Sequence, residues 1–264
     1  MLFRDYDSKR EEHLVFSEEE NTFISFLCQI KKVLDNHKIE FWLDCGTLLG
    51  VVRDGRFIPG EHDIDLGVWQ NKISDGIKIS ISRELTKKGF DVYLAENWIT
   101  IKKSEEIWAD IASYRLINNK AVIPKLEPQN LSGKFLTMFI KILSAPYYYQ
   151  INFRSYRQKN MKRITRLIRD ILVVISRILP SWLKKRIIKV ALIIYKKMGP
   201  KNVSWIIPSN YFRNLTEIRF HGIKFRVPDK TEEYLAYRYG KDWRIPKKDW
   251  VTERDDGAVI KHLS

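Results

Sequence analysis

The amino-acid sequence predicts an α+β fold, in which a mixed β-sheet is flanked by helices and carries a basic amphipathic helical insert. Apolar residues recur at helical spacing in several segments, and short apolar runs typical of strands lie between them. Charge is unevenly spread: residues 134–201 hold 17 of the 47 Lys and Arg residues and one of the 32 acids, giving +16 against −1 elsewhere. We therefore predict a core at 1–133, a basic insert at 134–201, and a part at 202–264 that completes the core.

The first predicted helix begins after Ser17, a capping residue followed by three acids that suit a helix N-terminus. It continues to Leu34 with apolar residues at helical spacing. A helix over 72–88, ended by Gly89, is expected further on. The remaining elements expected in this half are a strand at 39–43, a short helix entered through a Gly-Thr turn at 46–53, a loop at 53–60, and strands at 64–69, 90–94, 98–102 and 107–114.

Two amphipathic helices are expected in the insert, one on each side of Pro180. The first has the apolar face Ile164, Leu167, Ile168, Ile171, Leu172, Ile175 and Leu179. The second has the apolar face Leu183, Ile187, Val190, Ala191 and Ile194, opposed by Lys185, Lys189 and Lys196. After the insert, alternation over 216–227 around His221-Gly222 predicts a hairpin, and a helix is expected over 232–239.

Composition and hydropathy limit the class of protein. No run reaches the roughly 18 apolar residues expected of a membrane span, and the first residues lack the apolar stretch of a secretory signal. Two cysteines, Cys28 and Cys45, cannot build a disulfide framework or a cysteine-rich zinc site, which is typical of a reducing compartment. We expect a cytoplasmic protein, peripheral on the inner face of the membrane.

Two carboxylates two residues apart, Asp63 and Asp65, are the most informative feature of the sequence. In a strand they share one face, while Ile64 and Leu66 point to the other. Like charges this close repel each other unless a cation neutralises them, and all-oxygen ligation suits Mg²⁺, with Mn²⁺ as an alternative. The competing interpretation is an ordinary solvated strand edge.

Upstream and downstream residues complete a candidate phosphate site. Gly46 and Thr47 form a turn where backbone N–H groups can approach phosphate oxygens at a helix N-terminus. Asp110, an acid within an apolar strand-like run, is a candidate third carboxylate and general base, or a structural hydrogen-bonding group. Asp44 either contacts substrate or caps the short helix.

Two further side chains are candidates for substrate contact. Arg53 either pairs with a phosphate or one of the acids, or is an ordinary surface arginine. His62 either contacts substrate or has a structural role at the end of its loop.

These motifs resemble the signature of the LicD/fukutin family. The resemblance rests on FWLDCGTLLG at 41–50, Arg53, FIP at 57–59 and DIDLG at 63–67, and more broadly on FHGIKFRVP at 220–228 and YLAYRYGKDW at 234–243. It implies a nucleotidyltransferase-like fold in which Asp63 and Asp65 bind the metal. Bacterial members often read WDDDID where this chain has GEHDID, so His62 replaces an acid and Gly60 a tryptophan.

The resemblance implies a transferase that moves a phospho-alcohol, such as phosphocholine or ribitol phosphate, from a CDP-activated donor to a glycan or lipid-linked glycan of lipopolysaccharide, teichoic acid or capsule. Two alternatives stay open. One is a nucleotidyltransferase that moves NMP from an NTP to a small molecule, and the other is a non-catalytic membrane-bound module with the same fold.

The basic insert also has three interpretations. A basic surface can bind nucleic acid, basic amphipathic helices can lie on an anionic membrane, and two helices can simply pack on the core with a solvated basic face. The large apolar faces, with Trp182 and the aromatic run at 147–149, make nucleic acid the least favoured. We expect binding to an anionic membrane surface.

Overall fold

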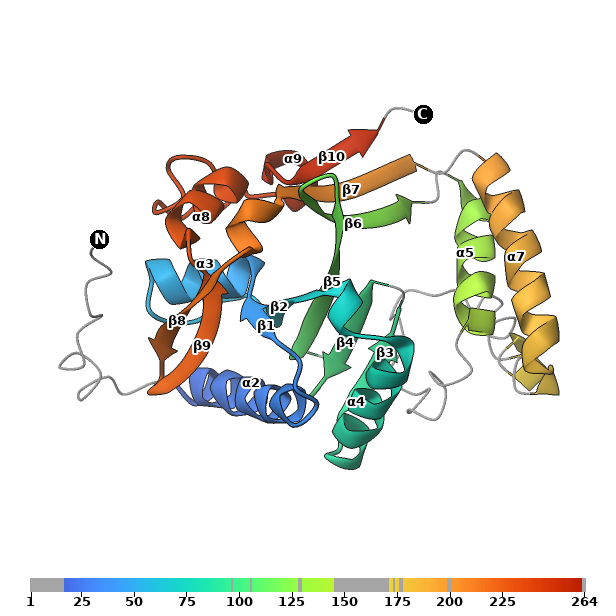
Figure 1. Cartoon of the computed structure of the whole chain (residues 1–264), viewed down its shortest axis with the longest axis horizontal. Helices are drawn as coiled ribbons and strands as arrows, with labels where there is room; N and C mark the ends of the chain where they lie inside the picture. Colours follow the sequence, from blue (N-terminus) through green and yellow to red (C-terminus); the bar gives the residue numbers. More distant parts are fainter. Residues whose placement is uncertain are drawn as a thin grey trace.

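The computed structural model describes residues 17–95, 97–104, 106–127, 130–144, 171–172, 174–175, 178–198 and 201–262. It confirms the α+β class: a mixed sheet lies at the centre, with helices packed around it (Figure 1). Strands β1, β2, β5, β6, β7 and β10 follow one another across the sheet, and β4 joins β3 to β5. Strands β8 and β9 form a separate two-stranded sheet.

The N-terminal elements follow the predicted order. Helix α2 (Glu18–Asn36) is capped by Ser17, whose Oγ accepts a hydrogen bond from the Glu20 N–H at 3.1 Å. Strand β1 (Phe41–Leu43), helix α3 (Cys45–Arg53) and strand β2 (Asp63–Trp69) come next. The apolar face of α2 is buried, and its residues belong to the same hydrophobic core as those of β1 and β2.

Strand β5 (Trp108–Ile117) is the centre of the sheet. Its first seven residues pair in parallel with β2, and most of the same stretch pairs antiparallel with β4 (Trp98–Lys102) on the other side. Helix α4 (Asp75–Lys87) follows a short 3-10 helix, η1 (Gln70–Lys72), and precedes β3 (Asp91–Leu94). The β2–α4–β5 crossover therefore puts two distant strands side by side, as a parallel pair requires.

A close approach explains one glycine of the carboxylate strand. A Cβ on Gly67 would lie 2.3 Å from the Trp42 ring, which belongs to the neighbouring strand β1. Trp42 is itself fully buried and stacks on Phe212 with ring centroids 4.8 Å apart. Because Gly67 has no side chain, the Trp42 indole can pack directly against its backbone in the core.

The insert begins and ends at paired strands. Strand β6 (Lys120–Glu127) pairs antiparallel with β7 (Lys201–Pro208), so that Glu127 and Lys201 are direct partners. Between them the structure describes helices α5 (Leu131–Ser144) and α7 (Ser181–Lys197), which lie side by side at one end of the molecule (Figure 1). The first predicted amphipathic helix lies mostly outside the described residues, as does the aromatic run at 147–149.

The C-terminal part returns to the sheet. After 3-10 helix η3 (Ser209–Phe212), strands β8 (Leu215–Phe220) and β9 (Ile223–Pro228) form the predicted hairpin, followed by α8 (Thr231–Tyr239). Helix α9 (Thr252–Asp255) leads into β10 (Val259–His262), which pairs with β7. The hairpin is tied to the N-terminal helix because the buried Glu20 accepts from the Phe57 N–H and pairs with His221 Nε2 at 3.0 Å.

The sequence interpretation was incomplete in two places. It did not predict strands β6, β7 and β10 or helix α5. It was also partly wrong about the second insert helix, because Val190 and Ile194 of its apolar face are exposed, whereas Lys184 is buried with Ala191 and Tyr195. In the part of the chain that the structure describes, no helix is both long and apolar enough to cross a membrane.

Candidate active site

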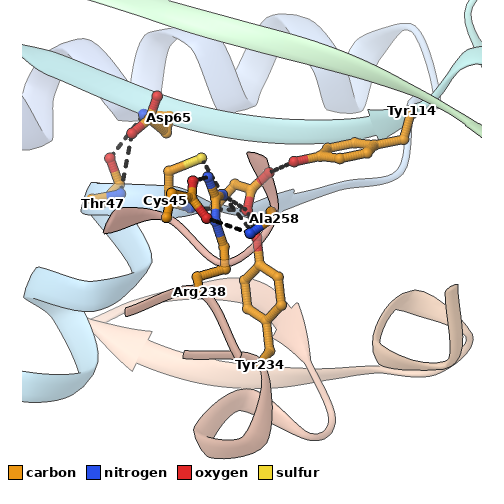
Figure 2. A network of polar contacts seen from close by, with 10 residues as sticks. Cys45, Thr47, Asp65, Tyr114, Tyr234, Arg238 and Ala258 are labelled. Atoms are coloured by element: carbon orange, nitrogen blue, oxygen red, sulfur yellow. Dashed lines mark hydrogen bonds and ion pairs between the residues drawn. The ribbon is translucent and has the colours of Figure 1, made fainter. Parts of the chain in front are cut away.

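The turn before α3 is built around a buried carboxylate. Asp44 is fully buried and caps α3, since its Oδ1 accepts from the Cys45 N–H at 2.8 Å. Two tyrosine hydroxyls donate to the same carboxylate: Tyr114 of β5 to Oδ2 at 2.6 Å, and Tyr234 of α8 to Oδ1 (Figure 2). Burial first, and the Asp44 charge with it, raise the pKa of both tyrosines well above the ordinary value, so both stay protonated as donors.

Arg238 of α8 links the turn before α3 to the C-terminal segment that precedes β10 (Figure 2). Its Nε and Nη2 donate to the carboxylate of Asp256, while Nη1 donates to Cys45 Sγ at 2.7 Å and to the Tyr234 hydroxyl at 3.1 Å. Nη1 also lies 3.6 Å from Asp44 Oδ1. Since Cys45 has a left-handed backbone with φ of 45°, these contacts also hold a strained residue in place.

The carboxylate strand lies directly against this turn. The Asp65 N–H donates to Thr47 Oγ1 at 2.8 Å, and the Gly46 N–H donates to Asp65 Oδ2 at 3.2 Å. The Asp44 N–H also donates to the Asp65 carbonyl at 3.0 Å. The Gly-Thr turn therefore positions Asp65 through three hydrogen bonds, two of which use backbone donors of the turn.

The parallel register of β2 and β5 brings the third carboxylate alongside. Asp65 and Asp110 are direct partners across the pair, and Asp63, two residues earlier on β2, shares their face. Thr100 Oγ1 of β4 donates a hydrogen bond to Asp110 Oδ1. Three strands thus hold three carboxylates in fixed positions on one side of the sheet.

The electrostatics of this group favour a bound cation. Burial is the largest cause of the raised pKa of Asp63, Asp65 and Asp110, and for Asp65 the neighbouring carboxylates Asp63, Asp44 and Asp110 raise it further. Partial desolvation, followed by the charge of Asp63, raises the pKa of Glu61 to about 7. Clustered carboxylates of this kind are destabilised when ionised, and a divalent cation relieves that cost.

These side chains suit a Mg²⁺ ion that is bound jointly by the protein and a substrate, and not a metal held by protein ligands alone. Among the described residues, no group of three or more His, Cys, Asp or Glu side chains is arranged to hold a metal ion by itself. Mg²⁺ commonly takes one or two carboxylates and fills its shell with water and substrate phosphate oxygens. Asp63 and Asp65 supply two carboxylates, and both line an open pocket.

That pocket has a volume of about 380 Å³ and two unlike groups of lining residues. The carboxylates, together with Gly46 and Arg53, form what we call the carboxylate wall. Aromatic residues of the sheet and of the C-terminal segment form what we call the aromatic wall: Trp98, Trp205, Tyr239, Trp243 and Trp250. Rings contact one another along it: Tyr239 and Trp250 have centroids 5.0 Å apart, and Trp98 meets Trp205 edge-on at 6.2 Å.

Five of the eight residues singled out from the sequence line this pocket: Gly46, Arg53, Asp63, Asp65 and Asp110. Thr47 lies behind the turn, where it holds Asp65. His62 is exposed beside Trp108 at a ring-centroid distance of 6.3 Å and does not line the pocket.

The substrate-contact interpretation of Asp44 is replaced by its alternative, the helix cap. Arg53 forms a bidentate pair with Asp54 at 2.7 and 2.9 Å, so it is not a free surface arginine.

Sequence reasoning missed the aromatic wall, Arg238 and Glu61. Glu61 lies against the turn so closely that a Cβ on Gly46 would come within 2.4 Å of its Oε2. One available signal was the acid retained at position 61 next to the carboxylate strand. The other was the aromatic and basic run at 234–243, which was noted for the resemblance and as a helix end, and whose residues Arg238, Tyr239 and Trp243 line the pocket.

Comparisons with known proteins bear on the same segment. A model of the LicD/FKTN/FKRP nucleotidyltransferase domain matches residues 38–127, which contain α3, β2 and β5. The match confirms the resemblance to the LicD/fukutin family over these residues. No curated protein matches the chain.

Solved structures show weaker similarity. The lincosamide antibiotic adenylyltransferase LnuA, with lincomycin bound, shares 12% identity at a TM-score of 0.35, covering 82% of each chain. ANT(2″)-Ia in complex with adenylyl-2″-tobramycin shares 15% identity at a TM-score of 0.30, covering 67% of this chain and 98% of that one. A solution structure of ANT(2″)-Ia gives 14% and 0.32, with 67% and 93% covered.

Proposed function

Because residues 38–127 match a model of the nucleotidyltransferase domain of the LicD/FKTN/FKRP family, we propose that the protein is a Mg²⁺-dependent transferase. It moves a phospho-alcohol, such as phosphocholine or ribitol phosphate, from a CDP-activated donor to a hydroxyl of a glycan. The observation that carries the proposal is that Asp63, Asp65 and Asp110 share one face of the sheet and line a pocket that is also lined by aromatic side chains.

The carboxylate wall suits a phosphate-bearing donor. Asp63 and Asp65 would hold the metal, which when bound neutralises negative charge on the donor phosphates. Arg53 lines the same wall and adds a positive charge that is partly matched by Asp54. Without the cation, a donor diphosphate would meet several carboxylates, so donor binding should require Mg²⁺.

Asp110 is suited to the role of general base. In the proposed reaction, an acceptor hydroxyl oxygen forms a bond to the transferred phosphorus, the bond from that phosphorus to CMP breaks, and the hydroxyl proton passes to a base. The carboxylate of Asp110 is oriented by Thr100, and burial raises its pKa above the usual range, which strengthens it as a proton acceptor.

The aromatic wall gives the pocket a surface for a ring. Indole and phenol faces stack on nucleobases and sugars alike, and five such side chains line the same pocket as the carboxylates. Lys247, whose Nζ lies 5.8 Å from the Trp250 ring and 2.8 Å from Asp242 Oδ1, also lines the pocket and adds a further positive charge to those of Arg53 and Arg238.

A thermal-shift screen tests the proposal. CDP-choline, CDP-ribitol, CDP-glycerol and nucleoside triphosphates are each added to the protein with and without Mg²⁺. We expect a CDP-linked compound to raise Tm only with the metal, and a variant with Asp63→Asn to lose that rise while keeping its fold. Retained Mg²⁺-dependent turnover in the Asp63→Asn or Asp65→Asn variant would remove the central claim.

Product analysis separates this function from the alternatives. Transfer of the phospho-alcohol releases CMP, whereas transfer of a nucleotide from an NTP releases pyrophosphate. A protein that binds neither class of ligand with Mg²⁺ would instead be a non-catalytic module with this fold.

A further inference from the structure

Helix α7 has one packed face and one exposed face. Its buried residues, Lys184, Ala191 and Tyr195, recur at helical spacing on the side that packs against α5. The opposite side carries Trp182 and Ile193, which are 63% and 50% exposed. Large apolar side chains on this side therefore have no covering element within the described residues.

The same exposure continues upstream of α7. Four apolar residues just before Pro180 are exposed at the helical spacing i, i+3, i+4 and i+7, and Ile178 is 78% exposed. These residues are Ile171, Val174, Ile175 and Ile178. A stripe with this spacing normally packs against a core. Here it is presented outward, four residues from Trp182.

Basic residues are interleaved with the apolar ones. Arg186, Lys189 and Lys197 are exposed and fall on the same side of α7 as Trp182 and Ile193. The surrounding segment 134–201 carries a net charge of +16, with one acid. Apolar side chains and cations thus share one surface of α7, and we define the α7 face as Trp182, Arg186, Lys189, Val190 and Ile193.

We propose that the α7 face binds the surface of an anionic lipid bilayer. Its apolar side chains enter the region between headgroups and acyl chains, while its Arg and Lys side chains remain among anionic headgroups. A tryptophan at the start of the helix suits this depth because its ring is apolar and its N–H can reach water. The proposal is independent of the reaction at the pocket, which lies on other elements.

The positive charge around the α7 face, together with its apolar side chains, favours a bilayer over a second copy of the chain or nucleic acid. A second copy of the chain would bring two segments of +16 together, which is repulsive at the distances of a protein interface. Nucleic acid would satisfy the cations, but it offers little to cover the branched aliphatic side chains. An anionic membrane satisfies both at once.

Liposome co-sedimentation of the full chain tests the proposal. Vesicles contain equal parts of phosphatidylglycerol and phosphatidylcholine, or phosphatidylcholine alone. We expect the protein to sediment with the anionic vesicles and to be released as the salt concentration rises. The double variant Arg186→Glu/Lys189→Glu should lower the partition coefficient about 100-fold, and Trp182→Ser/Ile193→Ser at least about 10-fold.

Matched variants control for charge and for exposed apolar area. Lys87→Glu/Lys88→Glu makes the same charge change at the end of α4. Leu116→Ser/Ile117→Ser removes apolar side chains that are 64% and 47% exposed at the end of β5. We expect both control variants to bind anionic vesicles nearly as well as the parent protein.

Several results would overturn the proposal. One is equal, negligible sedimentation with both kinds of vesicle, and another is a loss of binding in the control variants as large as in the α7 variants. A dimer in light scattering that Trp182→Ser/Ile193→Ser dissociates would assign the face to a second copy. Binding to duplex DNA that competes fully with the vesicles and depends on Arg186 and Lys189, but not on Trp182, would assign it to nucleic acid.

Discussion

The ion pair between Arg238 and Asp256 offers the sharpest test of how the site is held together. Both side chains are almost completely buried, at 4% and 2% exposed, and the carboxylate accepts hydrogen bonds from Nε, from Nη2 and from the Ala258 N–H. The substitution Asp256→Asn keeps the size of the side chain, but it removes the charge and one of the two acceptor oxygens.

The expected cost follows from what remains around Arg238. Breaking a buried pair by neutralising one partner typically costs about 3–5 kcal/mol. Asp44 Oδ1 still lies 3.6 Å from Nη1, so some compensation remains and we expect the lower end, about 3 kcal/mol. With a urea m-value of about 3 kcal/mol/M, the unfolding midpoint should fall by about 1 M.

A double-mutant cycle gives the assay its control. The variant Arg238→Met/Asp256→Asn removes both charges, so it should be more stable than the sum of the two single changes predicts, by about 2 kcal/mol. Asp255→Asn, which changes a more exposed neighbour paired with Arg254, should shift the midpoint much less. A midpoint shift below about 0.3 M for Asp256→Asn, or a cycle with no coupling, would refute the argument.

Three further outcomes are expected. In EDTA, Asp63→Asn should raise the free energy of unfolding by about 1 kcal/mol, because it removes one of the clustered charges; unchanged or lower stability in urea titration would contradict this. The rise in Tm caused by Mg²⁺ should be larger at pH 8 than at pH 6, because protons compete for carboxylates whose pKa is raised, that of Glu61 to about 7. In the metal-free protein Glu61 acts in the other direction: its contribution to the free energy of unfolding falls as the pH rises from the ordinary pKa of 4.5 toward 7, because its ionised form is disfavoured in the folded chain. A rise in Tm with Mg²⁺ that does not depend on pH would count against the carboxylate cluster. Gly67→Ala should cost about 2–4 kcal/mol, because its Cβ would meet the Trp42 ring, whereas Gly60→Ala has open space and should cost only about 1 kcal/mol for its positive φ; chemical denaturation compares the two, and equal costs would exclude the steric explanation.

Local signals account for the parts of the fold that the sequence predicted. Ser17 and the acids after it specify the start of α2, and Gly89 and Gly240 end α4 and α8 with positive φ angles. The alternation around His221-Gly222 specifies the β8–β9 hairpin. In each case the decisive contacts lie within a few residues, so composition and spacing are sufficient.

Distant pairing accounts for the parts that were missed. Strand β7 finds its partner β6 more than 70 residues earlier in the chain, before the insert, so no local turn indicated β7. Strand β6 did have a local signal, the Asn118-Asn119 turn that joins it to β5, and this signal was missed. The exposed side of α7 could not be chosen from periodicity, since both sides carry apolar residues and the packing of α5 decides which is buried.

The candidate site shows the same division. Asp63, Asp65 and Asp110 were identifiable because an acid in an apolar strand is unusual and costly. The role of Asp44 depended on Tyr114 and Tyr234, which lie 70 and 190 residues away and fill its acceptor positions. A carboxylate at a turn has the same local sequence whether it faces substrate or two buried hydroxyls.

The buried position of Asp44 also has a consequence during synthesis. Asp44 has all of its partners only when Tyr234 and Arg238 have packed against it, and the buried charge of Arg238 is in turn paired with Asp256. A nascent chain that has folded β1, β2 and β5 therefore pairs Asp44 with Tyr114 but still lacks Tyr234 and Arg238, and its pocket lacks the aromatic residues from α8 onward. Formation of the site is thereby linked to the last segment of the chain, so that partly synthesised protein should not bind or process the donor.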